Sequence, residues 1–148
     1  MTGTTHTREP QQQSGAALWA LRVLGAALLL AIAAIHIYLW QQGYRTIDVI
    51  GPAFLLQSVI AIGGALLVLV APWRLLPVAT LLGALFAIGS LGALLMTTFV
   101  GMFGFQESTS ADWWWETVAV EVGAFLVLGL LTLLTARPAL AAARRRGR

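Results

Sequence analysis

Four long apolar runs, separated by short polar connections, dominate this chain of 148 residues. The runs cover about residues 16–40, 52–70, 77–102 and 113–135. A helix needs roughly 20 apolar residues to cross about 30 Å of hydrocarbon, and each run is close to that length. Short connections make neighbouring helices antiparallel. The sequence therefore predicts an all-α integral membrane protein folded as an up-down four-helix bundle.

Composition excludes an ordinary soluble domain. Hydrophobic residues make up 59% of the chain and charged residues only 10%, whereas soluble domains are about 25% charged. Cysteine is absent, which excludes disulfides, thiolate metal ligands and cysteine nucleophiles. Most of the chain is therefore expected to lie in lipid.

Polar segments flank the four runs at both ends of the chain. Residues 1–15 are rich in Thr and Gln and contain Pro10, a composition too polar to fold alone. We expect this segment to be a flexible tail. The fourth run is expected to end at Arg137 and Pro138, which leaves residues 137–148 as an Arg-rich tail.

The first run also fits a second interpretation. Arg22, the apolar stretch that follows it and the small residues at Ala33 and Ala34 resemble a secretory signal peptide. Apolar residues continue through Trp40, and the polar segment before Arg22 is long for a signal peptide. These features favour a retained span; cleavage would leave three spans.

Arginine asymmetry predicts the orientation in the membrane. With four spans both termini share one side, and cytoplasmic loops carry an excess of basic residues. Arg45 alone falls on the opposite side, while the side of the termini holds Arg8, Arg22, Arg74, Arg137, Arg144, Arg145, Arg146 and Arg148. Both termini are therefore expected in the cytoplasm, with the chain in the bacterial cytoplasmic membrane.

Aromatic and basic residues near the span ends are expected to contact the lipid interface. Tryptophans gather where spans meet headgroups, so we expect interface anchors at Trp40, Trp113, Trp114 and Trp115. Arginines beside an anionic leaflet each contribute about 1 kcal/mol, which predicts lipid contact by Arg144, Arg145, Arg146 and Arg148. Because these arginines follow a span, we expect no nucleic-acid partner.

The stretch "VAVEVGAFLVL" places Glu121 inside the fourth run. At 1.5 Å per residue it lies about 9 Å inward of Trp115. Polar residues at similar depth on the other spans predict one shared polar layer, made of His36, Gln57, Thr97 and Glu121. Such residues commonly hold helices together, but an intramembrane carboxyl is a candidate functional group, and His36 beside it could complete a proton relay.

Known catalytic and cofactor signatures are missing. The sequence contains no nucleotide-binding, zinc-protease or serine-hydrolase motif, and His36 is the only histidine within a span, so a bis-histidine haem would need two copies of the chain. We therefore expect no enzymatic activity, no metal and no cofactor.

One stretch carries a resemblance. "HIYLWQQGYRTIDVIGPAFLLQ", residues 36–57, resembles a segment of small four-span membrane proteins of actinobacteria. The resemblance covers one span-loop-span unit and implies a four-span fold; it brings no activity and no functional residues.

Three functions fit this sequence. The short connections and the absence of a soluble module favour an accessory component of a membrane assembly, with a membrane-protein partner or a second copy of the chain. The polar layer favours a small proton-coupled transporter, although no inverted repeat with broken helices is evident. A quinone or haem redox subunit is the third possibility.

Overall fold

The computed structural model describes the backbone of residues 9–146 and the side chains of residues 15–136. Its helices are α1 (Glu9–Gln41), the 3-10 helix η1 (Tyr44–Thr46), α2 (Ile50–Val70), α3 (Leu76–Phe99) and α4 (Trp114–Arg146). Within residues 9–146 the only β pairing is an isolated bridge between Met102 and Phe105. The predicted all-α class and the four-helix bundle are confirmed.

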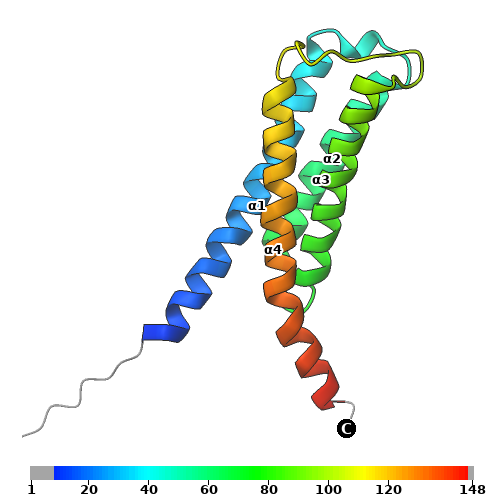
Figure 1. Ribbon diagram of the computed structural model, residues 1–148. Coiled ribbons are helices and arrows are strands. Elements are labelled where there is room, and N and C mark those ends of the chain that lie inside the picture. Colours follow the sequence, from blue (N-terminus) through cyan, green and yellow to red (C-terminus); the bar gives the residue numbers. More distant parts are fainter. Residues whose placement is uncertain (1–8, 147–148) are drawn as a thin grey trace, which may run out of the picture.

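The helices run up and down beside one another (Figure 1). Packing is extensive between α1 and α2, between α1 and α4 and between α3 and α4, and lighter between α2 and α3. We call the end that carries residues 42–49 and 100–113 the loop end. The opposite end, with the turn at residues 71–75, the start of α1 and the finish of α4, is the terminal end.

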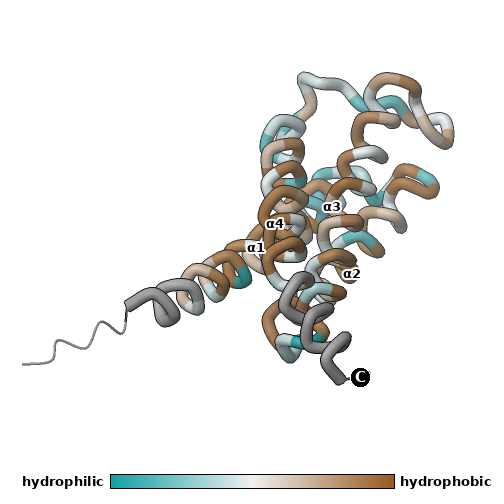
Figure 2. Tube along the Cα trace, turned by 60° about the horizontal axis from the view of Figure 1, so that its bottom comes forward, coloured by the Kyte–Doolittle hydropathy of each residue, from teal (hydrophilic) through white to brown (hydrophobic). Residues whose placement is uncertain are grey.

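All four long helices can cross a membrane. Their spanning parts are Gly15–Gln41, Ile50–Val70, Leu76–Phe99 and Trp114–Ala136. Figure 2 shows apolar residues along most of each helix. Large apolar side chains point outward, among them Leu56, Val59 and Leu133, each more than half exposed. The chain is a multi-pass integral membrane protein whose outer surface suits lipid.

Small residues form much of the interior. Ala61, Ala65, Ala87 and Ala124 are fully buried, so the helices approach closely, as is common in membranes. Leu128 fills the space left by two glycines: a Cβ on Gly25 would lie 2.6 Å from Leu128 Cδ2, and one on Gly83 2.9 Å from Leu128 Cδ1. The stripes of small residues in the sequence thus mark the packed faces.

The spanning part of α1, Gly15–Gln41, agrees with the predicted span of residues 16–40, but the helix itself starts earlier. α1 already begins at Glu9, within the segment expected to be a flexible tail. Pro10 does not prevent this, because proline in the first turn has no intrahelical hydrogen bond to lose. Residues 1–8 of the predicted tail lie outside the described residues.

The predicted end of the third span was wrong, whereas the predicted fourth span of residues 113–135 agrees with the spanning part Trp114–Ala136, beyond which α4 continues as a helix. α3 stops at Phe99 rather than at residue 102, because Gly101 takes a positive φ of 82° and its N–H donates to Met96 O, which terminates a helix. α4 continues to Arg146. Pro138 removes only one hydrogen bond, and the alanine-rich segment after it has high helix propensity.

Candidate functional site

Glu121 is the most deeply buried ionisable group of the described residues. It lies on α4 and is 0% exposed. Ser90, on α3, donates its hydroxyl proton to Glu121 Oε1. Glu121 Oε2 is also buried, yet it makes no hydrogen bond with any described residue. The carboxyl is therefore only half satisfied by the surrounding protein.

The hydrogen bonds continue from Ser90 to the other two helices. Gln57, on α2, donates from Nε2 to Ser90 Oγ, and the same nitrogen lies 2.9 Å from His36 Nε2 on α1. His36 Nδ1 lies 2.8 Å from Ile32 O. Because a carbonyl only accepts, Nδ1 carries the proton and Nε2 accepts from Gln57. We call the chain His36–Gln57–Ser90–Glu121 the polar chain.

The structure brings together three of the four residues predicted for the polar layer, one each from α1, α2 and α4. The prediction for the third helix was wrong. Ser90 takes the place of Thr97, whose hydroxyl donates to Leu94 O of its own helix, 2.9 Å away. The two residues are seven apart and share a helix face. Because α3 ends at Phe99, Thr97 lies only two residues from its end, too near the loop end to reach Glu121.

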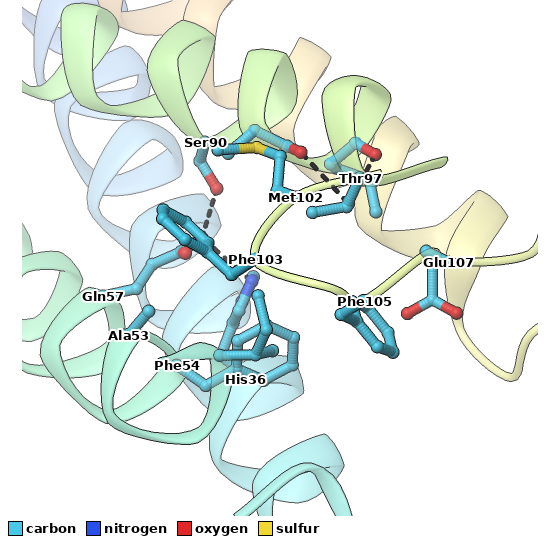
Figure 3. A pocket seen from close by; sticks show the side chains of 13 residues that line it. His36, Ala53, Phe54, Gln57, Ser90, Thr97, Met102, Phe103, Phe105 and Glu107 are labelled. Carbon is cyan, nitrogen blue, oxygen red and sulfur yellow. Dashed lines mark hydrogen bonds between the residues drawn. The ribbon is translucent and has the colours of Figure 1, made fainter. Parts of the chain in front are cut away.

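A cavity of about 130 Å³ lies above the polar chain, between α2, α3 and the segment of residues 102–107. We call it the loop-end pocket. Figure 3 shows Met102 near Ser90 and Phe103 near Gln57 and His36, while Phe105 lies farther along the same segment toward Glu107. Its walls combine apolar, aromatic and polar side chains, contributed by His36, Ile50, Ala53, Phe54, Gln57, Ser90, Ala93, Leu94, Thr97, Met102, Phe103, Phe105 and Glu107. The polar chain therefore joins a space that a small molecule could enter.

Tyr44 and Glu107 connect the two loops at the rim of this pocket. The Tyr44 hydroxyl donates to Glu107 Oε2 over 2.6 Å, and its ring stacks on Phe54 with centroids 5.0 Å apart. Burial, followed by the hydrogen bond to Glu107, raises the pKa of Tyr44 above its ordinary range. The pair links residues 63 apart, and no pattern in the sequence indicates it.

Three residues with strained backbones lie at the loop end. Val49, Phe103 and Trp113 have φ values of 66°, 53° and 64°. A non-glycine residue in this region costs about 1–3 kcal/mol and persists only where its surroundings enforce it; such residues cluster at functional sites. All three lie in the connections, and Phe103 is also part of the pocket wall.

The predicted interface anchors divide into two groups. Trp113 and Trp115 are 44% and 66% exposed, and Trp40 is half-buried. Trp114 is buried instead, and its Nε1 donates to Thr98 Oγ1 over 3.0 Å. Its assignment as an anchor was wrong, because neighbouring residues on a helix point about 100° apart and three successive tryptophans cannot share one face.

Arg22, which the sequence suggested as an orientation signal or as part of a signal peptide, caps a neighbouring helix. It is 3% exposed, and its guanidinium donates to the last carbonyls of α2: Nε to Val68 O over 2.6 Å and Nη2 to Leu69 O and Ala71 O over 2.9 and 2.5 Å. The carbon Cζ also lies 4.7 Å from the ring centre of Trp19 and 5.4 Å from that of Trp73. This site holds α1 against the end of α2.

The described residues contain no group of three or more His, Asp or Glu side chains placed to hold a metal ion. The side chains of Arg144, Arg145, Arg146 and Arg148, predicted to contact anionic lipid, lie outside the described residues. Comparison with protein-family models, curated proteins and solved structures gives no match. The resemblance of residues 36–57 to actinobacterial four-span proteins therefore stays a prediction.

Proposed function

We propose that this protein is a non-enzymatic accessory component of the bacterial cytoplasmic membrane that binds a small ligand in the loop-end pocket. The observation that carries the proposal is the polar chain, in which His36, Gln57 and Ser90 line a cavity and Glu121 lies behind them, bonded to Ser90. The partners are the lipid bilayer and either a membrane protein of the same assembly or a second copy of the chain.

A purely structural role accounts poorly for Glu121. Thr117 and Thr135 donate to carbonyls of their own helices, so their hydroxyl protons are satisfied without a residue of another helix. A buried polar atom without a hydrogen bond costs about 1–3 kcal/mol, and Glu121 Oε2 is such an atom. Interhelical contact alone would be served as well by a hydroxyl, so we infer that the carboxyl supports the pocket through Ser90, which it bonds and which lines the cavity.

The arginine distribution supports a pocket that faces outward. Both termini then lie in the cytoplasm, and the loop end lies on the opposite side. In this orientation the pocket is accessible from the outer leaflet and not from the cytoplasm.

A proton-coupled carrier is the second candidate. The unpartnered oxygen of Glu121 favours it, because an isolated intramembrane carboxyl is suited to taking up a proton. Between Glu121 and the terminal end, however, the interior is closed by Leu29 and Leu128, both fully buried. A carrier would need to open this apolar layer, whereas a binding protein would not.

The proposal is tested by filling the pocket. Ala93 is part of the pocket wall, whereas Ala119, also exposed and helical, is not. The wild type, Ala93→Phe and Ala119→Phe are purified from the same membranes and compared by native mass spectrometry. We expect a small molecule on the wild type and on Ala119→Phe and none on Ala93→Phe. Equal occupancy in all three, or none in the wild type, would contradict the proposal.

The carrier is tested separately in liposomes. An imposed pH gradient should drive proton uptake in the wild type and not in Glu121→Gln if the protein is a carrier. We expect no difference between the two, because the apolar layer around Leu29 and Leu128 separates Glu121 from the terminal end.

A further inference from the structure

We propose that the ligand is a cationic amphiphile, with an ammonium head in the loop-end pocket and an apolar tail in the groove between α2 and α3. The inference rests on the proposed function of the pocket as a ligand site. It adds the chemical class of the ligand and the path of its tail.

The polar atoms that face the pocket suit a hydrogen-bond donor. Gln57 Nε2 donates both hydrogen bonds of this side chain, to His36 and to Ser90. Its Oε1 makes no hydrogen bond with a described residue. Glu107 contributes a half-buried carboxylate, which accepts from Tyr44 and from Ser108 N and has lone pairs left for a further donor. No arginine or lysine lines the pocket. An ammonium group, which only donates, matches this set.

Aromatic rings in the same pocket favour a positive charge. Phe54, Phe103 and Phe105 all belong to its wall, and a cation near the face of an aromatic ring gains about 0.5–2 kcal/mol, most where water is excluded. The combination of aromatic rings with a carboxylate distinguishes an ammonium head from a neutral hydroxyl.

The charges around the loop end point the same way. The connections and adjoining first turn carry Asp48, Glu107, Asp112 and Glu116 against the single basic residue Arg45. Four acidic residues and one basic residue give a negative potential, which attracts cations and repels anions. An anionic amphiphile is therefore disfavoured.

A second, separate cavity lies nearer the terminal end, also lined by residues of α2 and α3. It measures about 330 Å³ and is lined only by apolar residues and glycine, namely Leu29, Ile60, Gly64, Leu67, Ala79, Leu82, Gly83 and Phe86. Ile60, Gly64 and Leu67 follow Gln57 at helical spacing on α2. The distance along the helix from Gln57 to Leu67 is about 15 Å. This groove can hold an alkyl tail whose head lies beside Gln57.

The head group is tested with three photoreactive probes that share one dodecyl chain with a diazirine at its end. They carry an ammonium, a hydroxyl or a sulfate head. The full chain in lipid nanodiscs is labelled at increasing probe concentration, and labelled peptides are identified by mass spectrometry. We expect saturable labelling of α2 and α3 by the ammonium probe at a concentration about tenfold below that of the alcohol, which is about 1.4 kcal/mol, and the weakest labelling by the sulfate. Glu107→Gln should remove the tenfold advantage of the ammonium probe.

The groove is tested with two adjacent glycines. A Cβ on Gly64 would meet only Leu29 Cδ1 at 3.5 Å, an ordinary contact, and one on Gly63 would meet nothing within 4 Å. Gly64→Leu fills the groove, whereas Gly63→Leu extends from the exposed face of the same helix. We expect Gly64→Leu to abolish saturable labelling and Gly63→Leu to label as the wild type does.

The outcomes separate the two proposals. Equal or tighter labelling by the alcohol or the sulfate, still lost when Ala93→Phe fills the pocket, would overturn the cationic class and leave the pocket as a ligand site. Saturable labelling that survives both Gly64→Leu and Ala93→Phe would overturn the tail path and the pocket. If none of the three probes labels the protein saturably, the proposed ligand class is overturned. A small molecule retained in native mass spectra would then still support the pocket as a ligand site.

Discussion

Replacing Arg22 by methionine tests whether this residue holds the terminal end of the bundle together. The substitution keeps an unbranched side chain that fits among Trp19 and Trp73, but it removes the donors to Val68 O, Leu69 O and Ala71 O. These carbonyls belong to the end of α2, where no further residue of the helix can bond to them. We expect the variant to be less stable and the α2–α3 turn to open more readily.

The expected loss follows from the three hydrogen bonds. Interhelical hydrogen bonds in membrane proteins contribute about 0.6 kcal/mol on average and at most about 1.7 kcal/mol, so three of them give roughly 2–5 kcal/mol. The methionine variant no longer buries a charged guanidinium, and the desolvation energy that is saved offsets part of this loss. A destabilisation of about 2–3 kcal/mol is therefore expected. Arg22→Lys should recover only part of it, because an ammonium cannot reproduce the planar fork of a guanidinium.

The assay is unfolding by increasing mole fraction of sodium dodecyl sulfate, followed by circular dichroism. Arg74→Met is the matched control, since Arg74 lies in the same turn region, is exposed and makes no hydrogen bond with a described residue. Both substitutions remove one arginine from the terminal end, so a general effect of charge on orientation would affect them equally. If Arg22→Met were as stable as Arg74→Met, the capping role would be refuted.

Three further predictions concern the polar chain, the rim and the orientation. Ser90→Ala should lower the free energy of unfolding by about 1–3 kcal/mol, because it leaves the buried carboxyl without its donor, whereas Thr97→Ala should change it by a few tenths at most; equal effects would contradict the placement of the polar chain. The raised pKa of Tyr44 means that the folded chain holds this proton more tightly than the unfolded chain, so its contribution is complete below about pH 10 and is lost as pH rises toward the folded pKa. Thermal melts of Tyr44→Phe should therefore decline less steeply above pH 10 than those of the wild type, and parallel declines would contradict this role. A reporter active only in the cytoplasm should work after Arg148, and one active only outside should work within Glu107–Asp112; the reverse pattern would overturn the orientation.

The bundle itself could be predicted from the sequence because lipid imposes a simple rule. Each span must be long, apolar and helical, and the four runs show this directly. The ends of the helices were less predictable. Gly101 stops α3 by adopting a positive φ, and α4 passes through Pro138; in each case the backbone geometry, rather than the hydropathy, decides where the helix ends.

The sequence predicted that the spans share a polar layer, and it identified three of the four residues of the polar chain. Depth along each span identifies His36, Gln57 and Glu121, because all three lie about two turns or less from a clear helix end. The partner on α3 depends on where that helix stops, and an error of three residues moved the choice from Ser90 to Thr97. Periodicity alone leaves both residues on the same face, so only the packed structure distinguishes them.

Contacts between distant segments could not be predicted from the hydropathy of the spans or from the depth of a residue along its span. Arg22 caps the end of α2, and Tyr44 bonds to Glu107 across two connections. Both contacts join residues more than 45 apart, and each uses a residue type that is common near membrane interfaces. An arginine that orients a span and an arginine that caps a helix have the same sequence signature.

The two halves of the bundle are held by different kinds of contact, and this difference bears on how a ligand could enter. The terminal half is fixed by the Arg22 cap, by the Thr132–Thr80 hydrogen bond of 2.8 Å and by Leu128 packed against two glycines. The loop half is held by the polar chain and by connections with strained backbones, which are the segments that local opening affects first. Movement of residues 102–107 alone would uncover the pocket and leave the helices in contact below it. Under the proposed function, ligand exchange would therefore require no separation of the spans, whereas a carrier would have to open the apolar layer around Leu29 and Leu128.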